Sequence, residues 1–350
     1  MNGLVQRLAV LSGLRDRDAL DTELVRLVLH GANVDLSGAT LFRIVGEGDE
    51  RRCLSLAAAT AGQEIPTRDL LWSDWSLLPR LSDSPLRTNA MHKGRAVQTE
   101  GPCEGGLHTV VLPMVGTQGL EVMLEVTASH SLQPAQVDLL QSLLLAYQNL
   151  LGLLDYGERD SLTELLNRKT FDGAFFKATS DQRNAVSGEF SERRETASGG
   201  VGVFLAVLDI DHFKRVNDNY GHLIGDEVLL LVARLMRDNF RFHDQLYRFG
   251  GEEFVILMRC DSAQYAESAL ERLRERVQAY KFPQAGTITV SIGVSSLMPN
   301  DTPSSAFGRA DKAVYFAKGN GRNQVCNYHT LVAEGKLAEQ VVDEMDVDLF

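Results

Sequence analysis

The order of apolar segments after Val201 constrains the fold of this chain more than any other sequence feature. Short runs rich in Val, Ile and Leu alternate with longer segments whose apolar residues recur every three or four positions, which predicts strands alternating with helices. The predicted strands are VGVFLAVLDID, both arms of QLYRFGGEEFVILM, GTITVSIGVSSL and NQVCNY, and the predicted helices are IGDEVLLLVARLMRDNF, AQYAESALERLRERVQAY and SAFGRADKAVYFAK. The order βαββαβαβ extends the ferredoxin-like pattern, so we expect an α+β domain.

The first 130 residues have a different pattern. DTELVRLVLHGANVD predicts a helix, GATLFRIV and CLSLAAAT predict strands, and HTVVLPMVGTQGLEVMLEVTA predicts a strand, a glycine turn and another strand. Antiparallel strands between an opening and a closing helix suggest an α+β sensor-like module. A chain of 350 residues that is 44% hydrophobic is long enough for two such domains, each with its own core.

A heptad-like stripe lies between the two halves. Its apolar residues recur at alternating spacings of three and four: Val137, Leu140, Leu144, Tyr147, Leu151 and Leu154. This stripe fits a helix that pairs with a copy of itself, and it also fits an amphipathic helix packed on its own domain. The apolar segment 139–154 contains four Gln, Ser and Asn residues and is shorter than a membrane span, so we expect no transmembrane helix.

Composition and charge limit which partners the protein can bind and indicate the cellular compartment. A net charge of -12 argues against a nucleic-acid or anionic-membrane partner, because both need a basic surface. The four cysteines are far apart, and the N-terminus has no secretory signal pattern, so we expect a reducing cytoplasm. Residues 176–200 are rich in Ser, Gly, Glu and Arg without an apolar period, which predicts a mobile loop or insertion.

Acidic side chains follow two of the predicted strands. In a ferredoxin-like sheet, the first strand and the strand that enters the hairpin run parallel, so Asp209 and Asp211 should lie beside Gly250-Gly251 and Glu252. Asp211 also stands where the next helix begins and is an N-cap candidate, which makes Asp209 the better metal ligand. Crowded carboxylates repel one another unless a cation joins them, and Mg²⁺ prefers oxygen ligands together with substrate phosphates. The sequence therefore predicts a divalent-metal and nucleotide-phosphate site.

A plain hairpin or a calcium-binding loop would each account for part of this pattern. A Gly-Gly turn with acidic neighbours is, when it stands alone, typical of a solvated hairpin. An EF-hand loop in DIDHFKRVNDNYG is excluded, because Phe213 and Lys214 stand where an acceptor and a glycine are needed.

RFGGEEF together with DIDHFKRVNDNYGHLIGD resembles the signatures of the GGDEF family, the diguanylate cyclases that join two GTP molecules into cyclic di-GMP. The resemblance runs from Asp160 to about Val325, opening with DSLTELLNRKTF and closing with RADKAVYFAKGNGRN. Two departures are visible: Glu164 stands where a glycine is common, and the 176–200 segment is longer than the usual connection. Neither departure touches the nucleotide motifs.

The resemblance implies a nucleotidyl-cyclase palm with two Mg²⁺ ions, or Mn²⁺, held by Asp209, the backbone carbonyl of Ile210, and Glu252. Glu252, or less favourably Glu253, would accept the proton of the attacking 3′-hydroxyl. The other implied roles are guanine recognition by Asn217 and Asp226, substrate contact by His222, clearance for the nucleotide at Gly250 and Gly251, and phosphate or transition-state contacts by Lys214, Lys318 and Arg322. A histidine before a helix, or a lysine or arginine on a surface, also commonly has no role beyond structure and solvation.

Arg241 and Asp244 have the spacing of the family's inhibitory Arg-x-x-Asp product site. An ordinary surface ion pair is the alternative. Because each domain binds one GTP and the product contains two, the resemblance implies a homodimer, with the 137–154 helix as its natural interface. A non-catalytic receptor for cyclic di-GMP is the alternative function, although all the glycines and carboxylates of the motif are present.

The N-terminal half resembles a GAF domain, with a PAS-like fold as the second choice, and its signal or ligand is unknown. We assign no ligand role to its scattered cysteines and histidines, namely Cys53, Cys103, His92 and His108. The expected division is a sensor domain at 1–132, a coiled-coil signalling helix at 133–159, a GGDEF domain at 160–328 and an acidic tail at 329–350. The acidic segment EGKLAEQVVDEMDVDLF of this tail is either a short amphipathic helix or a disordered end, and no role is assigned to it.

Overall fold

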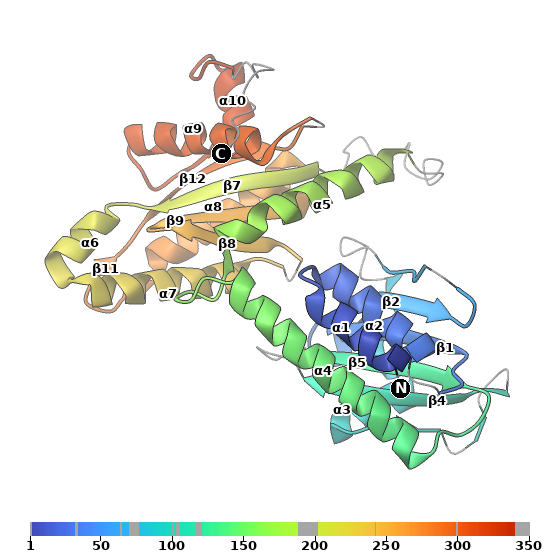
Figure 1. The fold of residues 1–350 in the computed structure, drawn as a ribbon. Coiled ribbons are helices and arrows are strands. Elements are labelled where there is room, and N and C mark those ends of the chain that lie inside the picture. Colours follow the sequence, from blue (N-terminus) through green and yellow to red (C-terminus); the bar gives the residue numbers. More distant parts are fainter. Residues whose placement is uncertain are drawn as a thin grey trace. The chain divides into compact units, whose positions relative to one another are not determined.

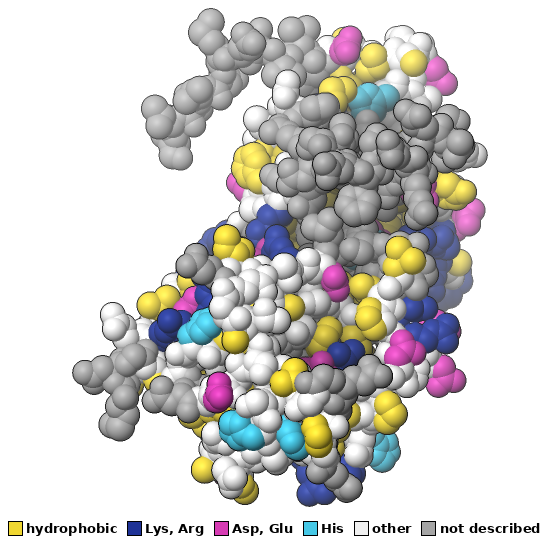
Figure 2. Space-filling model, turned by 90° about the vertical axis from the view of Figure 1, so that its right-hand side faces the viewer, with side chains coloured by type: hydrophobic (Ala, Val, Ile, Leu, Met, Phe, Trp, Pro, Cys, Tyr) yellow, Lys and Arg dark blue, Asp and Glu magenta, His cyan; other side chains and the backbone are white. Residues whose placement is uncertain are grey.

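The structure, a computed structural model, describes residues 2–31, 34–63, 65–69, 77–99, 101–102, 106–115, 121–187, 202–241, 243–298 and 300–339. The chain forms two compact units, Met1–Gly157 and Glu158–Phe350, each built around its own hydrophobic core. Cys103 lies outside the described residues. On the face that Figure 2 shows, acidic and basic side chains are interspersed.

The N-terminal unit is an antiparallel sheet with helices on both faces (Figure 1). Its strands follow the order β2-β1-β5-β4-β3 and are β1 (Gly38–Val45), β2 (Arg52–Thr60), β3 (Val97–Gln98), β4 (His108–Val115) and β5 (Glu121–Ala128). One face packs on α1 (Asn2–Gly13), α2 (Arg17–Gly31) and α4 (Pro134–Glu158), and the other on α3 (Pro85–Lys93). The described part of this unit also contains the 3-10 turns Gly48–Glu50 and Leu81–Asp83.

The heptad-like stripe of α4 is buried within this unit. Leu140, Leu144, Tyr147, Leu151 and Leu154 belong to the core between α2, α4 and the sheet. Of the two uses that the sequence allowed, packing on its own domain is the one observed, so pairing through this stripe was the wrong expectation. A helix that covers a sheet needs the same apolar period as a coiled coil, which is why the pattern alone did not separate them.

Helix α4 is longer than the apolar segment 139–154 from which the absence of a transmembrane helix was predicted. At 25 residues, α4 is the one helix in the described part of the chain that is long and apolar enough to cross a membrane. Length and composition alone are weak grounds for a span, because the core helix of a soluble protein meets the same test. The buried stripe is what such a core helix shows.

The C-terminal unit has three layers, with a six-stranded sheet between two helical layers (Figure 1). The strand order is β13-β12-β7-β9-β8-β6, and the bounds are β6 (Leu166–Asn167), β7 (Gly202–Ile210), β8 (Gln245–Gly250), β9 (Glu253–Cys260), β12 (Val290–Ser296) and β13 (Val325–Asn327). Helices α7 (His222–Asn239) and α8 (Ala263–Ala279) cover one face, and α5 (Arg168–Ser187) and α9 (Pro303–Gly319) cover the other. The ferredoxin-like α+β pattern predicted from the sequence is therefore confirmed.

Several smaller elements were not anticipated: α6 (Phe213–Tyr220), the ribbon of β10 (Lys281–Phe282) with β11 (Gly286–Thr287), and α10 (Tyr328–Ala333). The loop expected from residue 176 was wrong in its first part, because α5 continues to Ser187. Residues 188–200 lie outside the described residues. Helix α10 buries Tyr328 and Leu331 and ends before the acidic segment 334–350, for which a short helix or a disordered end was left open. Residues 334–339 are not helical, and residues 340–350 lie outside the description.

Candidate active site

The end of β7 and the β8–β9 hairpin meet at one edge of the sheet. Both β7 and β8 pair antiparallel with β9, so they run in the same direction, and the register places Asp209 opposite Glu253. Gly250 pairs with Glu253, so the two residues at the hairpin tip are Gly251 and Glu252 rather than the glycine pair. Both glycines nevertheless have positive φ, 141° and 52°. The predicted convergence of the carboxylates with the glycine turn is thus observed.

Space above the glycines is open. A Cβ at Gly250 or Gly251 would meet no atom of the described chain within 4 Å. The local fold therefore needs glycine for its backbone angles and not for packing. The open space is consistent with a bound molecule approaching the backbone there.

Burial and mutual repulsion define the electrostatics of this edge. Burial raises the pKa of Asp209, which is 5% exposed, and an ion pair with Lys318 opposes the rise, with Nζ 2.7 Å from Oδ2. Burial and then the neighbouring charge of Asp209 raise the pKa of both Glu252 and Glu253. Three carboxylates thus share one lysine, an arrangement that favours binding of a further cation.

A magnesium ion fits these residues if substrate completes its coordination. Among the described residues, no group of three or more His, Cys, Asp or Glu side chains is arranged to hold a metal. The predicted set contains only two carboxylates, from Asp209 and Glu252, with the carbonyl of Ile210. The amide of Ile210 lies 3.4 Å from the carbonyl oxygen of Glu252, so the three are neighbours. Mg²⁺ commonly takes one or two carboxylates and fills its other positions with water and phosphate oxygens.

Asp211 is neither a helix cap nor placed like Asp209. The N-cap of α6 is His212, in the left-handed region at φ 60°, without a side-chain cap bond. The carboxylate of Asp211 is buried and accepts hydrogen bonds from Thr289 and Ser291. The sequence could not reveal these partners, because they lie about 80 residues later, in β12 and just before it.

The predicted guanine-binding residues lie on two successive helices. Asn217 is on α6, and Asp226 is exposed on the first turns of α7, which begins at His222. Sequence reasoning missed Gly225, where a Cβ would lie 2.0 Å from Oδ1 of Asn217. A glycine inside an otherwise regular helix was the available signal, because such a residue usually permits a close approach.

The remaining predicted cations come from α6, from α9 and from the loop after α9. Lys214 is exposed on α6, and Arg322 is exposed in the loop after α9 with φ 61°. Lys318, expected to face phosphate, instead pairs with Asp209 in this structure.

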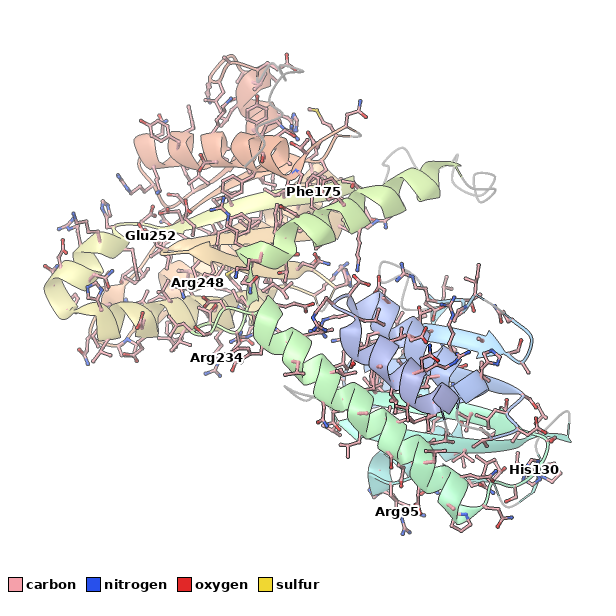
Figure 3. All side chains as sticks on the ribbon, viewed as in Figure 1. Arg95, His130, Phe175, Arg234, Arg248 and Glu252 are labelled. Atoms are coloured by element: carbon pink, nitrogen blue, oxygen red, sulfur yellow. The ribbon has the colours of Figure 1, made fainter. Side chains whose placement is uncertain are left out.

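Arg248 ties the hairpin tip to the start of the unit and was not predicted. Its guanidinium donates to both carboxylate oxygens of Asp160, at 3.0 and 3.2 Å, and to the carbonyl of Gly251 at 3.0 Å. Figure 3 shows Arg248 and Glu252 at the same end of the sheet. Burial raises the pKa of Asp160, but hydrogen bonds from Thr163 and Arg248 outweigh it and hold the pKa below its usual value.

Glu164, the departure from the family pattern, occupies a turn that glycine would suit. Its φ is 59°, in the left-handed region that favours glycine. Arg159 donates to its carbonyl at 2.7 Å, and its own N–H donates to the carbonyl of Asp160 at 2.8 Å. The turn is therefore kept with a residue that is less suited to it.

Arg241 and Asp244 lie at the opposite end of β8 from the glycines. Their contact runs through the backbone, with the N–H of Arg241 donating to Oδ2 of Asp244 at 2.9 Å. Burial raises the pKa of Asp244 to about 6. The surface ion pair considered from the sequence is not the contact observed, because the carboxylate caps a tight turn.

Comparison with known proteins places the second unit in a family. A family model described as diguanylate cyclase, GGDEF domain, matches residues 158–324. The chain is 34% identical over 217 residues to the diguanylate cyclase DgcZ of Escherichia coli, covering 59% of this chain and 67% of DgcZ. It is 45% identical over 129 residues to DgcP of Pseudomonas aeruginosa, covering 36% of this chain and only 19% of DgcP.

A solved structure of the coiled coil and GGDEF domain of DgcB from Caulobacter crescentus, in complex with c-di-GMP, aligns with a TM-score of 0.46 at 29% identity, covering 57% of this chain and all of that one. The family model covers the segment that contains the carboxylates, the glycine turn and helices α6 and α7. The chain belongs to the GGDEF family of diguanylate cyclases.

Proposed function

We propose that this chain is a diguanylate cyclase that condenses two GTP molecules into cyclic di-GMP and releases two pyrophosphates. The observation that carries the proposal is the meeting of Asp209, Glu252 and Glu253 at the open glycine turn, with raised pKa values and Lys318 alongside. A solvated hairpin has no need for a buried carboxylate opposite its tip.

Asp209, the Ile210 carbonyl and Glu252 would hold two Mg²⁺ ions, and Mn²⁺ fits the same oxygen ligands. When bound, the metal would polarise the α-phosphate, activate the 3′-hydroxyl and neutralise the departing pyrophosphate. Metal at Asp209 would compete with Lys318 for the same oxygens. Lys318 would then be available to the phosphates, as the family resemblance implies.

The chain's own groups supply proton transfer and recognition. A glutamate with a raised pKa is a stronger base, which suits Glu252, with Glu253 as the alternative, to accept the 3′-hydroxyl proton. Guanine offers two donors on one edge, and the carboxylate of Asp226 and the amide oxygen of Asn217 are suitable acceptors. His222, Lys214 and Arg322 would complete the contacts to the nucleotide and its phosphates.

Two copies of the domain must face each other for two GTP molecules to react, so we propose a homodimer. The inner stripe of α4 is buried, and this leaves its outer stripe for pairing. That stripe, roughly 150° around the helix at 100° per residue, contains Ser142, Leu145, Asn149, Gly152 and Tyr156 at alternating spacings of three and four. Leu145 is 57% exposed and Tyr156 90% exposed, which supports this surface as the interface.

The N-terminal unit would be a GAF-like cytoplasmic sensor, with a PAS-like domain as the alternative, for an unidentified signal. Its sheet between helices supports either fold. Arg241 and Asp244 would bind product and inhibit the enzyme. Protonated Asp244 loses its charge and keeps less acceptor capacity for the guanine donors, so inhibition should weaken as the pH falls through about 6.

The test is incubation of the full chain, stripped of bound nucleotide, with GTP and Mg²⁺, followed by chromatographic separation of the products. Glu252→Gln keeps the side-chain size, removes the charge, and should lower the rate at least a hundredfold. Glu275→Gln, on the exposed side of α8, is the matched control and should keep the wild-type rate. Wild-type protein that binds cyclic di-GMP but never forms it would establish the receptor alternative.

A further inference from the structure

The carboxylate of Asp211 joins three segments at the end of β7. It is 4% exposed. Ser291 Oγ, at the start of β12, donates to Oδ1, and Thr289 Oγ1, one residue before this strand, donates to Oδ2, both at 2.7 Å. The backbone N–H of Asn323 donates to Oδ2 at 3.1 Å from the loop that follows α9. These three donors occupy the carboxylate, whereas Asp209, two residues earlier, forms an ion pair with Lys318.

The loop that Asp211 holds has an unfavourable backbone. Arg322 and Asn323 are consecutive non-glycine residues with φ of 61° and 46°. L-residues avoid this region, and such a conformation persists only where its surroundings enforce it. Two further contacts help: Arg322 N–H donates to the Ala317 carbonyl at 3.0 Å, and Arg274 Nη1 donates to Oδ1 of Asn323 at 2.8 Å. Asp211 is the contact that ties this loop to the strand of the metal-binding carboxylate.

We propose that Asp211 is a positioning residue for Arg322, which it orients toward the nucleotide by fixing the left-handed loop. The inference rests on the proposed function, in which Arg322 contacts the phosphates. The two aspartates at the end of β7 then have separate tasks. Asp209 holds metal or Lys318, and Asp211 holds the loop that carries the second cation.

A double-mutant cycle on the full chain tests this coupling. Asp211→Ala and Arg322→Ala are each expected to lower kcat/KM for GTP at least tenfold. If Asp211 acts through Arg322, the double variant will match Arg322→Ala within about twofold, because interacting residues are non-additive. A double variant that loses the product of the two factors would overturn the proposal.

A matched control separates positioning from general destabilisation. The side chain of Asp301 is 4% exposed and accepts from Arg309 at 2.7 Å, near the other end of β12. The effect of Asp301→Ala should multiply with that of Arg322→Ala. Asp211→Asn is the second variant if Asp211→Ala does not fold, since it keeps the volume and one acceptor oxygen. Asp211→Asn should lower kcat/KM by a smaller factor than Asp211→Ala, and it should have no further effect when Arg322→Ala is also present.

The same variants distinguish positioning from metal binding. The Mg²⁺ concentration that gives the half-maximal rate is measured for Asp211→Asn, alone and combined with Arg322→Ala. If Asp211→Asn raises this concentration in both backgrounds, Asp211 is a metal ligand and the proposal is overturned. If the wild type makes no cyclic di-GMP, the proposed function fails, and the double-mutant cycle is then measured by the Kd for GTP. If the two substitutions weaken GTP binding by additive free energies, the positioning role of Asp211 is refuted, whatever the outcome for the proposed function.

Discussion

Asp21 lies buried between α2 and α4, where its ionisation should control the stability of the N-terminal unit. It is 6% exposed, and Tyr147 donates its phenol to Oδ1 at 2.5 Å. Burial raises the pKa of Asp21 to about 7, although the Tyr147 hydrogen bond and the nearby Arg17 and Arg43 oppose the rise. Folding therefore favours the protonated carboxyl.

The sign and size of the effect follow from linkage. Between about pH 4 and pH 7 the unfolded chain has lost this proton while the folded chain retains it, so the free energy of unfolding falls as the pH rises. A shift from 3.8 to about 7 corresponds to about 4 kcal/mol, at about 1.4 kcal/mol per pH unit. Above about pH 7 both states are ionised, and the contribution stays lost. Asp21→Asn removes the titration and should leave a flat profile over this range.

Urea denaturation at pH 5, 6, 7 and 8 measures the effect. The only two tryptophans of the chain, Trp72 and Trp75, lie in the N-terminal half, so their fluorescence reports on that unit. Wild-type protein should lose stability steadily up to about pH 7, whereas Asp21→Asn should not. Glu23→Gln, two residues later on α2, retains Asp21 and the charges that set its pKa and should keep the wild-type slope. A wild-type profile without slope, or the same slope in Asp21→Asn, would show that Asp21 does not carry this titration.

Three further changes test the C-terminal unit. Gly225→Ala should leave folding intact, because alanine favours a helix by about 1 kcal/mol over glycine, but its Cβ should displace the Asn217 side chain. In a competition between GTP and ATP, the variant should discriminate between the two nucleotides at least tenfold less than the wild type. Unchanged discrimination would show that Asn217 does not recognise guanine. Glu164→Gly should stabilise the unit by about 0.5–1 kcal/mol by relieving a left-handed residue, measured by denaturation, and a loss of stability would contradict this. Arg248→Ala should lower the free energy of unfolding by about 2 kcal/mol, because Asp160 loses a charged hydrogen-bond donor, and it should lower the cyclase rate. A variant with wild-type stability and rate would show that the contact between Arg248 and Asp160 is not needed.

Periodicity predicted the sheet and its main helices because the apolar pattern is local to each element. The same pattern could not decide what α4 packs against, since a sheet face and a second helix both require an apolar stripe. Nor did it predict α6, which is only eight residues long. Helix α5 was not predicted, and its second half was taken for a loop, because polar composition does not prevent a helix.

At the site, too, some features could be predicted from the sequence and others could not. The place of Asp209 beside the glycine turn followed from strand direction, which the sequence order determines. The contacts of Asp211 and Arg248 did not, because each joins segments separated by about 80 or more residues. Gly225 does carry a signal that the sequence alone contains, namely a glycine inside a helix.

The ratio of pyrophosphate to cyclic di-GMP released from GTP by the full chain is the sharpest test of the proposed reaction. Two domains that each attack the other's α-phosphate must release two pyrophosphates for each cyclic dinucleotide. We expect that ratio with Mg²⁺, and a loss of both products in Asp209→Asn. Release of inorganic phosphate without a dinucleotide, or no turnover at any protein concentration, would contradict it.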